Sequence, residues 1–256
     1  MFGNVYLCAI PFEMRPKATI SLAVAGLFVL AIAILFFLAP GSKPIFRIGD
    51  GTNGYSPGST GEDEIYGEKG DDRIASFGGG DFLDGGDGDD VLISGGGSDA
   101  LLGGVGNDRL MSGDGDDYLI GDEGDDALIA GDGDDTLEGG PGNDSLEGGA
   151  GKDRFIFNSP LDASGNVDTI ADFSVTYDSV LLANTVFTTL VAGKLHEDAF
   201  HIAAAAHDRS DRIVYDPNTG WLDYDADGNG ERAAIHFATI SPGLAFTNTN
   251  FIVSGR

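Results

Sequence analysis

The sequence has few of the residues that bind nucleic acid or form disulfides. Lysine and arginine number 14 against 42 aspartate and glutamate residues, for a formal charge of −28. Because phosphate binding needs cationic side chains, this balance excludes nucleic acid as a partner and favours multivalent cations. Cys8 stands alone, so no intramolecular disulfide can hold the fold together. Glycine, in contrast, is abundant at 41 residues, which indicates many tight turns.

Long apolar stretches are also rare, with one exception near the N-terminus. Residues 18–39 are 22 consecutive residues without a charge, long enough to cross a membrane as a helix. Arg15 and Lys17 precede this run, which favours a cytoplasmic segment 1–17 and an outside location for the rest. We expect an uncleaved signal anchor. A cleaved signal peptide and a buried helix are the alternatives, and the run is long for the apolar region of a signal peptide.

The chain then becomes periodic. Residues 40–57 are rich in Gly, Pro and Ser and indicate a linker, and one decayed repeat at its end is the alternative. From 58 to 156 the sequence can be cut into eleven nonapeptides without an insertion, and unit 1 begins at Gly58. The fourth position is always Gly, the sixth always Asp, and the eighth always Ile, Leu or Phe.

Each repeated position has a physical meaning. The first six residues of a unit predict a tight turn, since glycine tolerates positive φ and close backbone approach. The last three predict a short strand with one apolar side chain pointing inward. Two units close one coil of 18 residues, and stacked coils about 4.8 Å apart form parallel sheets on both sides. Eleven units give five and a half coils with a thin core, too small to offset the ordering of the backbone alone.

The sixth-position aspartates predict metal binding. Alternate units lie on the same side of the coil, so each Asp faces the turn of the unit two further along. Carboxylate and glycine carbonyl oxygens line the gap between those turns, and hard oxygen ligands suit calcium. Pairs of units n and n+2 allow at most about nine gaps. The candidate carboxylate ligands are Asp63, Asp72, Asp81, Asp90, Asp99, Asp108, Asp117, Asp126, Asp135, Asp144 and Asp153. The candidate carbonyl ligands are Gly70, Gly86, Gly88, Gly95, Gly97, Gly104, Gly106, Gly113, Gly115, Gly124, Gly131, Gly133, Gly140 and Gly142.

The charge of the array supports this hypothesis. Residues 58–156 contain 27 acidic and 5 basic residues, for a net charge of −22. Such a segment should stay expanded without metal and fold when metal neutralises it, so the binding free energy becomes folding free energy. A metal-free acidic spacer rich in glycine is the alternative.

The units resemble G-G-x-G-x-D-x-U-x, the RTX (hemolysin-type) nonapeptide of secreted bacterial calcium-binding proteins. The resemblance covers residues 58–156 and implies a right-handed parallel β-roll with Ca²⁺ as its ligand. Four units depart from the motif at their second position, and Lys152 adds a positive charge to the last turn. Those second-position residues are Ser59, Glu68, Phe77 and Asp122. Sites near Asp63, Asp81 and Asp153 are therefore the least regular.

Residues 157–256 have ordinary globular composition. Alternating apolar and polar segments predict a mostly β domain that continues the roll, with a short helix near 196–206. The segments GKDRFIFNS, NVDTIADF and DRIVYDPNTGWLDYDADGNG resemble the region after the repeats in serralysin-type RTX exoproteins. That resemblance implies a C-terminal signal for type I secretion, and so a secretion machinery as partner.

No catalytic motif is found, so we expect a binding protein rather than an enzyme. The chain is expected outside the cell or at its surface, anchored through residues 18–39. The alternatives are an adhesive or surface-assembly protein, a non-catalytic C-terminal part of a larger RTX exoenzyme such as a serralysin-type protease, and a hydrolase using carboxylates such as Asp208 and Asp211.

An incomplete EF-hand-like run from Asp223 to Gly228 is interpreted as a hairpin turn. The four histidines are interpreted as surface or packing residues.

Overall fold

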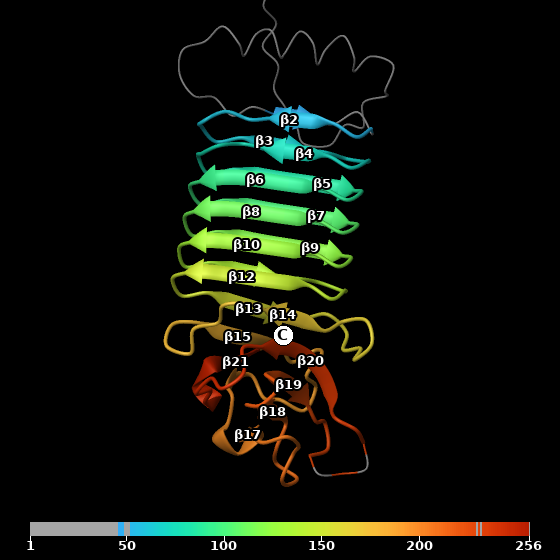
Figure 1. Cartoon of the computed structure of the whole chain (residues 1–256), viewed down its shortest axis with the longest axis vertical. Helices are drawn as coiled ribbons and strands as arrows, with labels where there is room; N and C mark the ends of the chain where they lie inside the picture. Colours follow the sequence, from blue (N-terminus) through green and yellow to red (C-terminus); the bar gives the residue numbers. More distant parts are fainter. Residues whose placement is uncertain (1–45, 49–51, 229, 231, 256) are drawn as a thin grey trace, which may run out of the picture. The chain divides into compact units, whose positions relative to one another are not determined.

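The described part of the chain is built from β-strands. The computed structural model describes residues 46–48, 52–228, 230 and 232–255, which belong to the unit Ser42–Arg256. Their strands form two sheets on opposite sides of a parallel β-solenoid of flat coils stacked along one axis (Figure 1). The expected all-β roll is confirmed, and it places the turns of successive coils above one another.

One sheet has ten strands in the described residues, and most of them pair with the strand 18 residues away. Their order in the sheet is β1 (Phe46–Ile48), β3 (Glu64–Tyr66), β5 (Phe82–Asp87), β7 (Ala100–Val105), β9 (Tyr118–Glu123), β11 (Thr136–Glu138), β13 (Arg154–Phe157), β15 (Ser179–Ala183), β21 (Phe251–Ser254) and β16 (Gly193–Lys194).

The opposite sheet has eleven strands in the same part of the chain. Their order is β17 (Phe200–Ile202), β18 (Ile213–Asp216), β19 (Trp221–Tyr224), β20 (Ile235–Ile240), β14 (Asp168–Ile170), β12 (Ser145–Ala150), β10 (Ala127–Asp132), β8 (Arg109–Asp114), β6 (Val91–Gly96), β4 (Arg73–Ala75) and β2 (Tyr55–Pro57).

The register shows why the nonapeptide folds this way. Leu110 pairs with Leu128, and Leu128 pairs with Leu146, so equivalent residues stack at each coil. All eleven eighth-position side chains point inward and are at most 1% exposed. The strands are longer than the three residues expected from the sequence: most run on through the first three residues of the next unit, because those residues also pair between coils.

Part of the segment read as a linker belongs to the roll. Strand β1 pairs with β3, and strand β2 pairs with β4, both in parallel. The coil pattern therefore begins before the first regular nonapeptide.

The C-terminal region continues both sheets and closes the end of the roll. Strands β14 and β15 pair with β12 and β13, and β20 and β21 follow them. Phe155, the last core residue of the array, lies 5.8 Å from Phe173, whose ring stacks on Phe246 at 4.9 Å. This aromatic cluster covers the apolar column that the repeats would otherwise leave open.

The prediction of a short helix near residues 196–206 is wrong. The structure has one 3-10 turn, Glu197–Ala199, followed directly by strand β17. Strand β17 pairs in parallel with β18, and the ring of Phe200 lies 5.3 Å from that of Phe251. Sheet pairing and aromatic packing outweigh the local helical pattern here.

The expected membrane helix, residues 18–39, lies outside the described residues. Among those that are described, no helix is long and apolar enough to cross a membrane.

Candidate metal centre

The first six residues of each unit form a tight turn, and the turns stack in two columns. The turns of even-numbered units form one column and those of odd-numbered units form the other. All fourteen glycines expected to offer carbonyl ligands have positive φ, as in Gly86 at 103° and Gly88 at 146°. A Cβ built on Gly106 would lie 2.1 Å from the carbonyl oxygen of Gly88. At the fourth position the turns are therefore too closely stacked for a side chain, and the carbonyl oxygens point along the column.

Three of the irregular second positions keep the same backbone shape without glycine. Glu68, Phe77 and Asp122 have φ of 72°, 107° and 69°. These are strained values for residues with a side chain. The stack imposes the turn conformation even where the sequence departs from glycine.

The sixth-position aspartates form one continuous hydrogen-bonded ladder per column. All eleven are buried, with at most 5% exposed. The N–H of Asp90 donates to Oδ1 of Asp108 at 2.7 Å, and the N–H of Asp108 donates to Oδ1 of Asp126 at 2.8 Å. Each carboxylate thus fixes the turn 18 residues before it, which orients its second oxygen.

That second oxygen defines the candidate site. In Asp81, Asp90, Asp99, Asp108, Asp117, Asp126, Asp135, Asp144 and Asp153, Oδ2 is buried and accepts no hydrogen bond from the described part of the chain. Nine buried carboxylate oxygens without a partner are costly, since each loses its water without compensation. Burial raises the pKa of Asp90 and Asp108 to about 6, and that of Asp126 and Asp135 to about 7. A cation in the gap would remove this cost.

The donor set fits a hard divalent cation. Among the described residues, no three His, Cys, Asp or Glu side chains converge to hold a metal by themselves. A metal in the gap would therefore need main-chain carbonyls as further ligands, and the stacked glycines have carbonyls that point along the column. Mixed carboxylate and carbonyl oxygen ligands suit Ca²⁺, which accepts six to eight oxygens in flexible geometry.

The two columns differ in the residue that begins each turn. In even units it is always glycine: Gly67, Gly85, Gly103, Gly121 and Gly139. We call this the glycine column. In odd units it is Gly58, Ser76, Ser94, Ser112, Ala130 and Gly148, and we call this the serine column. The hydroxyl of Ser76 donates to the carbonyl of Ser94 at 3.2 Å, and that of Ser94 donates to the carbonyl of Ser112 at 3.1 Å.

The irregular positions at the ends of the array have distinct outcomes. The carboxylate of Asp63 accepts a hydrogen bond from its own turn, from the N–H of Ser59 at 2.6 Å. The ammonium of Lys152 lies 3.8 Å from exposed Asp134, so its charge points away from the column. Oδ2 of Asp153 remains buried like its predecessors.

Sequence reasoning missed two aspartates that extend the ladders. Asp168 accepts from the N–H of Asp144 at 3.1 Å, and Asp178 accepts from the N–H of Asp153 at 3.0 Å. Burial, with the nearby charge of Asp144, raises the pKa of Asp168 to about 8. Each begins a triplet like that of a repeat, Asp-x-Ile at Asp168 and Asp-x-Val at Asp178. They follow Asp144 and Asp153 by 24 and 25 residues, whereas aspartates within the array follow one another in a column by 18.

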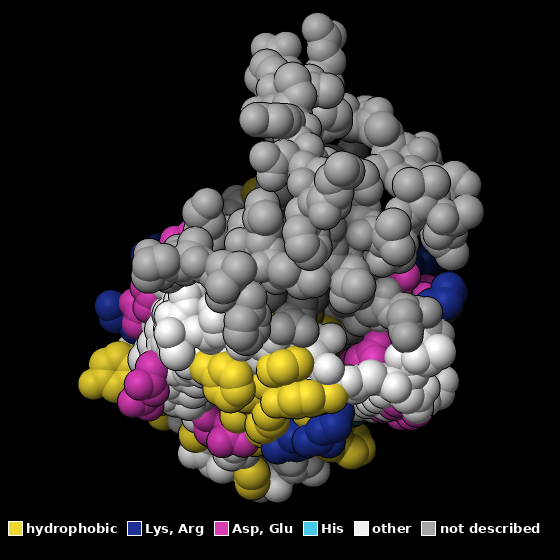
Figure 2. All heavy atoms as spheres, turned by 90° about the horizontal axis from the view of Figure 1, so that it is seen from above, with side chains coloured by type: hydrophobic (Ala, Val, Ile, Leu, Met, Phe, Trp, Pro, Cys, Tyr) yellow, Lys and Arg dark blue, Asp and Glu magenta, His cyan; other side chains and the backbone are white. Residues whose placement is uncertain are grey.

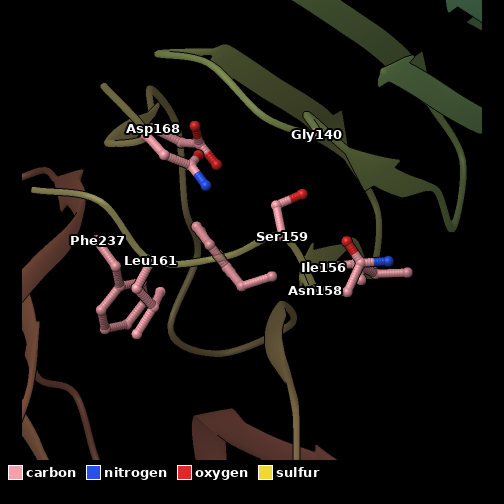
Figure 3. A pocket seen from close by; sticks show the side chains of 9 residues that line it. Gly140, Ile156, Asn158, Ser159, Leu161, Asp168 and Phe237 are labelled. Atoms are coloured by element: carbon pink, nitrogen blue, oxygen red, sulfur yellow. The ribbon is translucent and has the colours of Figure 1, made fainter. Parts of the chain in front are cut away.

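Asp168 also borders a small recess where the array meets the C-terminal region (Figure 3). Gly140, Ile156, Leu161 and Phe237 line it as well. Its free space suits about one water molecule, so it does not fit an organic substrate.

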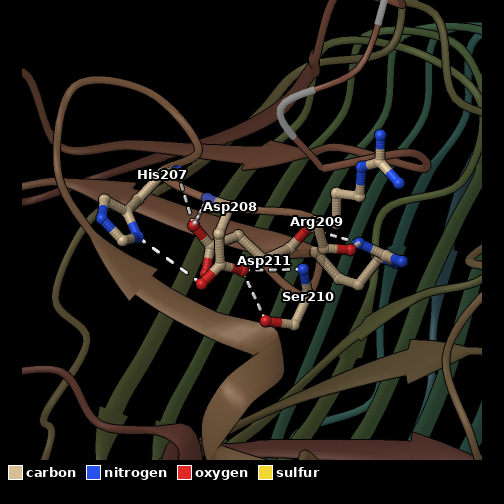
Figure 4. A network of polar contacts seen from close by, with 6 residues as sticks. His207, Asp208, Arg209, Ser210 and Asp211 are labelled. Atoms are coloured by element: carbon tan, nitrogen blue, oxygen red, sulfur yellow. Dashed lines mark hydrogen bonds and ion pairs between the residues drawn. The ribbon is translucent and has the colours of Figure 1, made fainter.

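The carboxylates considered for acid–base chemistry hold a loop together. Oδ2 of Asp211 accepts from the N–H groups of His207 and Asp208, and Asp208 accepts from the N–H of Ser210 at 2.7 Å (Figure 4). The EF-hand-like run begins in strand β19 at Asp223 and continues into the connection to its antiparallel partner β20, as expected for a hairpin. His236 packs on Trp221, 4.7 Å between ring centres.

The fold and the site define a class: a parallel β-solenoid with stacked, oxygen-lined acidic turns. The family model of the RTX calcium-binding nonapeptide repeat matches residues 57–76, 76–110, 93–128, 102–137 and 129–159. Residues 57–159 therefore belong to the RTX calcium-binding nonapeptide-repeat family, and the array is a calcium-binding β-roll.

Two further comparisons add little. A search of curated proteins gave no match. Among solved structures, the extracellular lipase LipA from Serratia marcescens is similar over 84% of this chain, at 17% identity and a TM-score of 0.35. This chain spans 40% of the length of that structure.

Proposed function

We propose that this chain is an extracellular calcium-binding protein whose repeat array folds when Ca²⁺ binds. The observation that carries the proposal is the set of nine buried Oδ2 atoms without a hydrogen-bond partner in the described residues. They stack in two columns of a segment with a net charge of −22. Without a cation, this arrangement combines unpaired buried carboxylates with strong like-charge repulsion.

The two oxygens of each sixth-position aspartate have different roles in the proposed binding. Oδ1 of each aspartate holds the preceding coil through a main-chain N–H, and Oδ2 remains for the ion. The carbonyls of the second- and fourth-position glycines point toward the equivalent glycines of the next coil. Calcium would supply charge neutralisation and crosslink adjacent coils, so binding and folding become one reaction.

An outside location follows from the same chemistry. A roll that needs calcium folds only where calcium is plentiful, which is outside the cell. The resemblance of residues 157–256 to the secretion-signal region of RTX exoproteins supports export by a type I machinery. The apolar run 18–39 would keep the protein at the cell surface. The proposal gives the chain a binding role without catalysis.

The test is far-UV circular dichroism of the 256-residue chain, titrated with Ca²⁺ and separately with Mg²⁺ from a chelated start. We expect a transition from coil to β-structure that is driven by calcium at sub-millimolar to millimolar concentration and not by magnesium. A chain that is already folded in chelator and indifferent to calcium would overturn the proposal.

A further inference from the structure

The outward faces of the two sheets are apolar in the middle of the roll. In units 4 to 8 the ninth residue of the repeat, which points to solvent, is Ile93, Leu102, Met111, Ile120 and Ile129. An open sheet face normally carries polar side chains at such positions. Five consecutive apolar residues therefore need an explanation other than the folding of the roll.

On the eleven-stranded sheet these side chains form an unbroken ladder. Ile93 pairs with Met111, and Met111 pairs with Ile129, and each is partly exposed. On the same face, the residues two positions earlier in each strand are Arg73, Val91 and Arg109, which pair with one another from coil to coil. Neither arginine forms an ion pair within the described residues.

On the ten-stranded sheet the residues beside the equivalent ladder are acidic, whereas on the eleven-stranded sheet Arg73 and Arg109 offset the exposed Asp114 and Asp132. Leu102 pairs with Ile120, and the ladder is flanked by Asp84 before it and Glu138 after it. The next row adds Phe82 and Tyr118, and Tyr118 is 38% exposed. Figure 2 looks along the roll from above and shows hydrophobic, basic and acidic side chains next to one another.

We infer that the eleven-stranded face of one molecule docks on the ten-stranded face of a second copy of this chain. This pairing brings Arg73 and Arg109 toward Asp84 and joins two apolar ladders. Two copies of the ten-stranded face would instead bring the acidic residues Asp84 and Glu138 of both molecules together. Because the two docking faces differ, the contact does not close, and copies add side by side in an open row.

The size of the faces sets the strength of this contact. Four coils at about 4.8 Å by six residues at about 3.3 Å give about 400 Å² per partner. The total of about 800 Å² is below the range of stable complexes, so the association is weak and favoured by high local concentration. The inference rests on the proposed function, since the faces exist only when calcium has folded the roll.

The test uses charge reversal on each face of the 256-residue chain, with sedimentation velocity across a concentration series in calcium and in a detergent that covers the apolar run 18–39. Arg109→Glu damages one face and Asp84→Arg damages the other, so we expect each variant alone to stay monomeric where the unaltered chain self-associates. Mixed in equal amounts, they should associate again, because the unaltered faces pair with each other and the two reversed charges are opposite in sign. Lys152→Glu reverses an exposed charge in a turn, away from both faces, and should leave association unchanged.

Circular dichroism of the same samples separates the two proposals. A chain that folds in calcium but stays monomeric up to about 1 mM overturns the docking inference and leaves the calcium proposal intact. Association that both reversals leave unchanged also overturns it, and so does a mixture that stays monomeric. A chain that does not fold in calcium defeats the proposed function, and the docking inference with it.

Discussion

The glycine column and the serine column share one repeat, yet they solve the problem of buried carboxylates differently. In the glycine column a Cβ built on Gly85 would lie 2.4 Å from Oδ2 of Asp90, so the oxygen occupies the space a side chain would need. In the serine column, burial raises the pKa of Asp99, but the nearby hydroxyl of Ser94 opposes the rise. Burial therefore raises the pKa of Asp90 further than that of Asp99, and on the proposed function the glycine column would depend more on the cation.

The C-terminal end of the serine column supports this comparison. Its turns there begin with Ala130 and Gly148, which have no hydroxyl. Burial raises the pKa of Asp135 to about 7 and that of Asp153 to about 6, as in the glycine column. The hydroxyl, rather than the side of the roll, accounts for the difference.

The largest expected effect comes from placing a serine in the glycine column. In Gly103→Ser the new Cβ would lie 2.5 Å from Oδ2 of Asp108 and 2.7 Å from the carbonyl oxygen of Gly121. Overpacking of this kind costs about 1–3 kcal/mol, so the calcium concentration at the folding midpoint should rise several-fold or more. Gly96→Ser is the matched control, since its Cβ would meet only atoms 3.7 Å away or further. Equal midpoints for both variants would break the comparison.

The second prediction removes one charge from each column. Asp108→Asn keeps an oxygen to accept the N–H of Asp90 but removes a charged ligand. We expect it to lose one bound ion and bind calcium more weakly, while its calcium-free state is less repelled and more folded. Asp99→Asn should show a smaller gain in chelator, because Ser94 already moderates its carboxylate. Calcium stoichiometry by titration calorimetry and dichroism in chelator check both.

Asp125→Asn is the control for that prediction. Asp125 is an exposed fifth-position residue of the glycine column, where the chain already has Asn107 and Asn143. Its substitution should change neither the ion count nor the folded fraction. A loss of binding equal to that of Asp108→Asn would show that net charge matters more than the buried gap.

The third prediction concerns pH in the absence of calcium. Burial raises the pKa of Asp108 to about 6 and of Asp126 to about 7, above the value of about 3.9 for an unfolded chain. The folded state therefore binds more protons than the unfolded state between those values, and its stability is lost as pH rises through 6 to 7. We expect chelated protein to gain β-structure as pH falls from 7.5 toward 5. Dichroism that is flat over this range would contradict the burial of these groups.

The smallest expected effect is in the serine column. Ser94→Ala removes the hydroxyl that donates to the carbonyl of Ser112 and should cost about 0.5–1.5 kcal/mol of unfolding free energy. Ser145→Ala, at an exposed strand position, should change little. Urea unfolding in saturating calcium measures both. A cost above that of Gly103→Ser would reverse the ranking of the columns.

The sequence by itself determined the coil. Glycine at the fourth position, aspartate at the sixth and an apolar residue at the eighth predict the turn, the ladder and the core, because each depends only on neighbours 18 residues away. It also identified every aspartate of the regular array that the structure places in the columns. These features are local and periodic, so pattern is sufficient to find them.

The tertiary structure alone decided what happens where the period ends. Asp168 and Asp178 join the ladders only because their loops return each strand to register with the coil before it, and loop lengths leave no periodic trace. Strand β17 replaced the expected helix because a sheet edge was there to pair with it. The difference between the columns likewise needed the stack, since a serine and a glycine matter only when Oδ2 lies beside them.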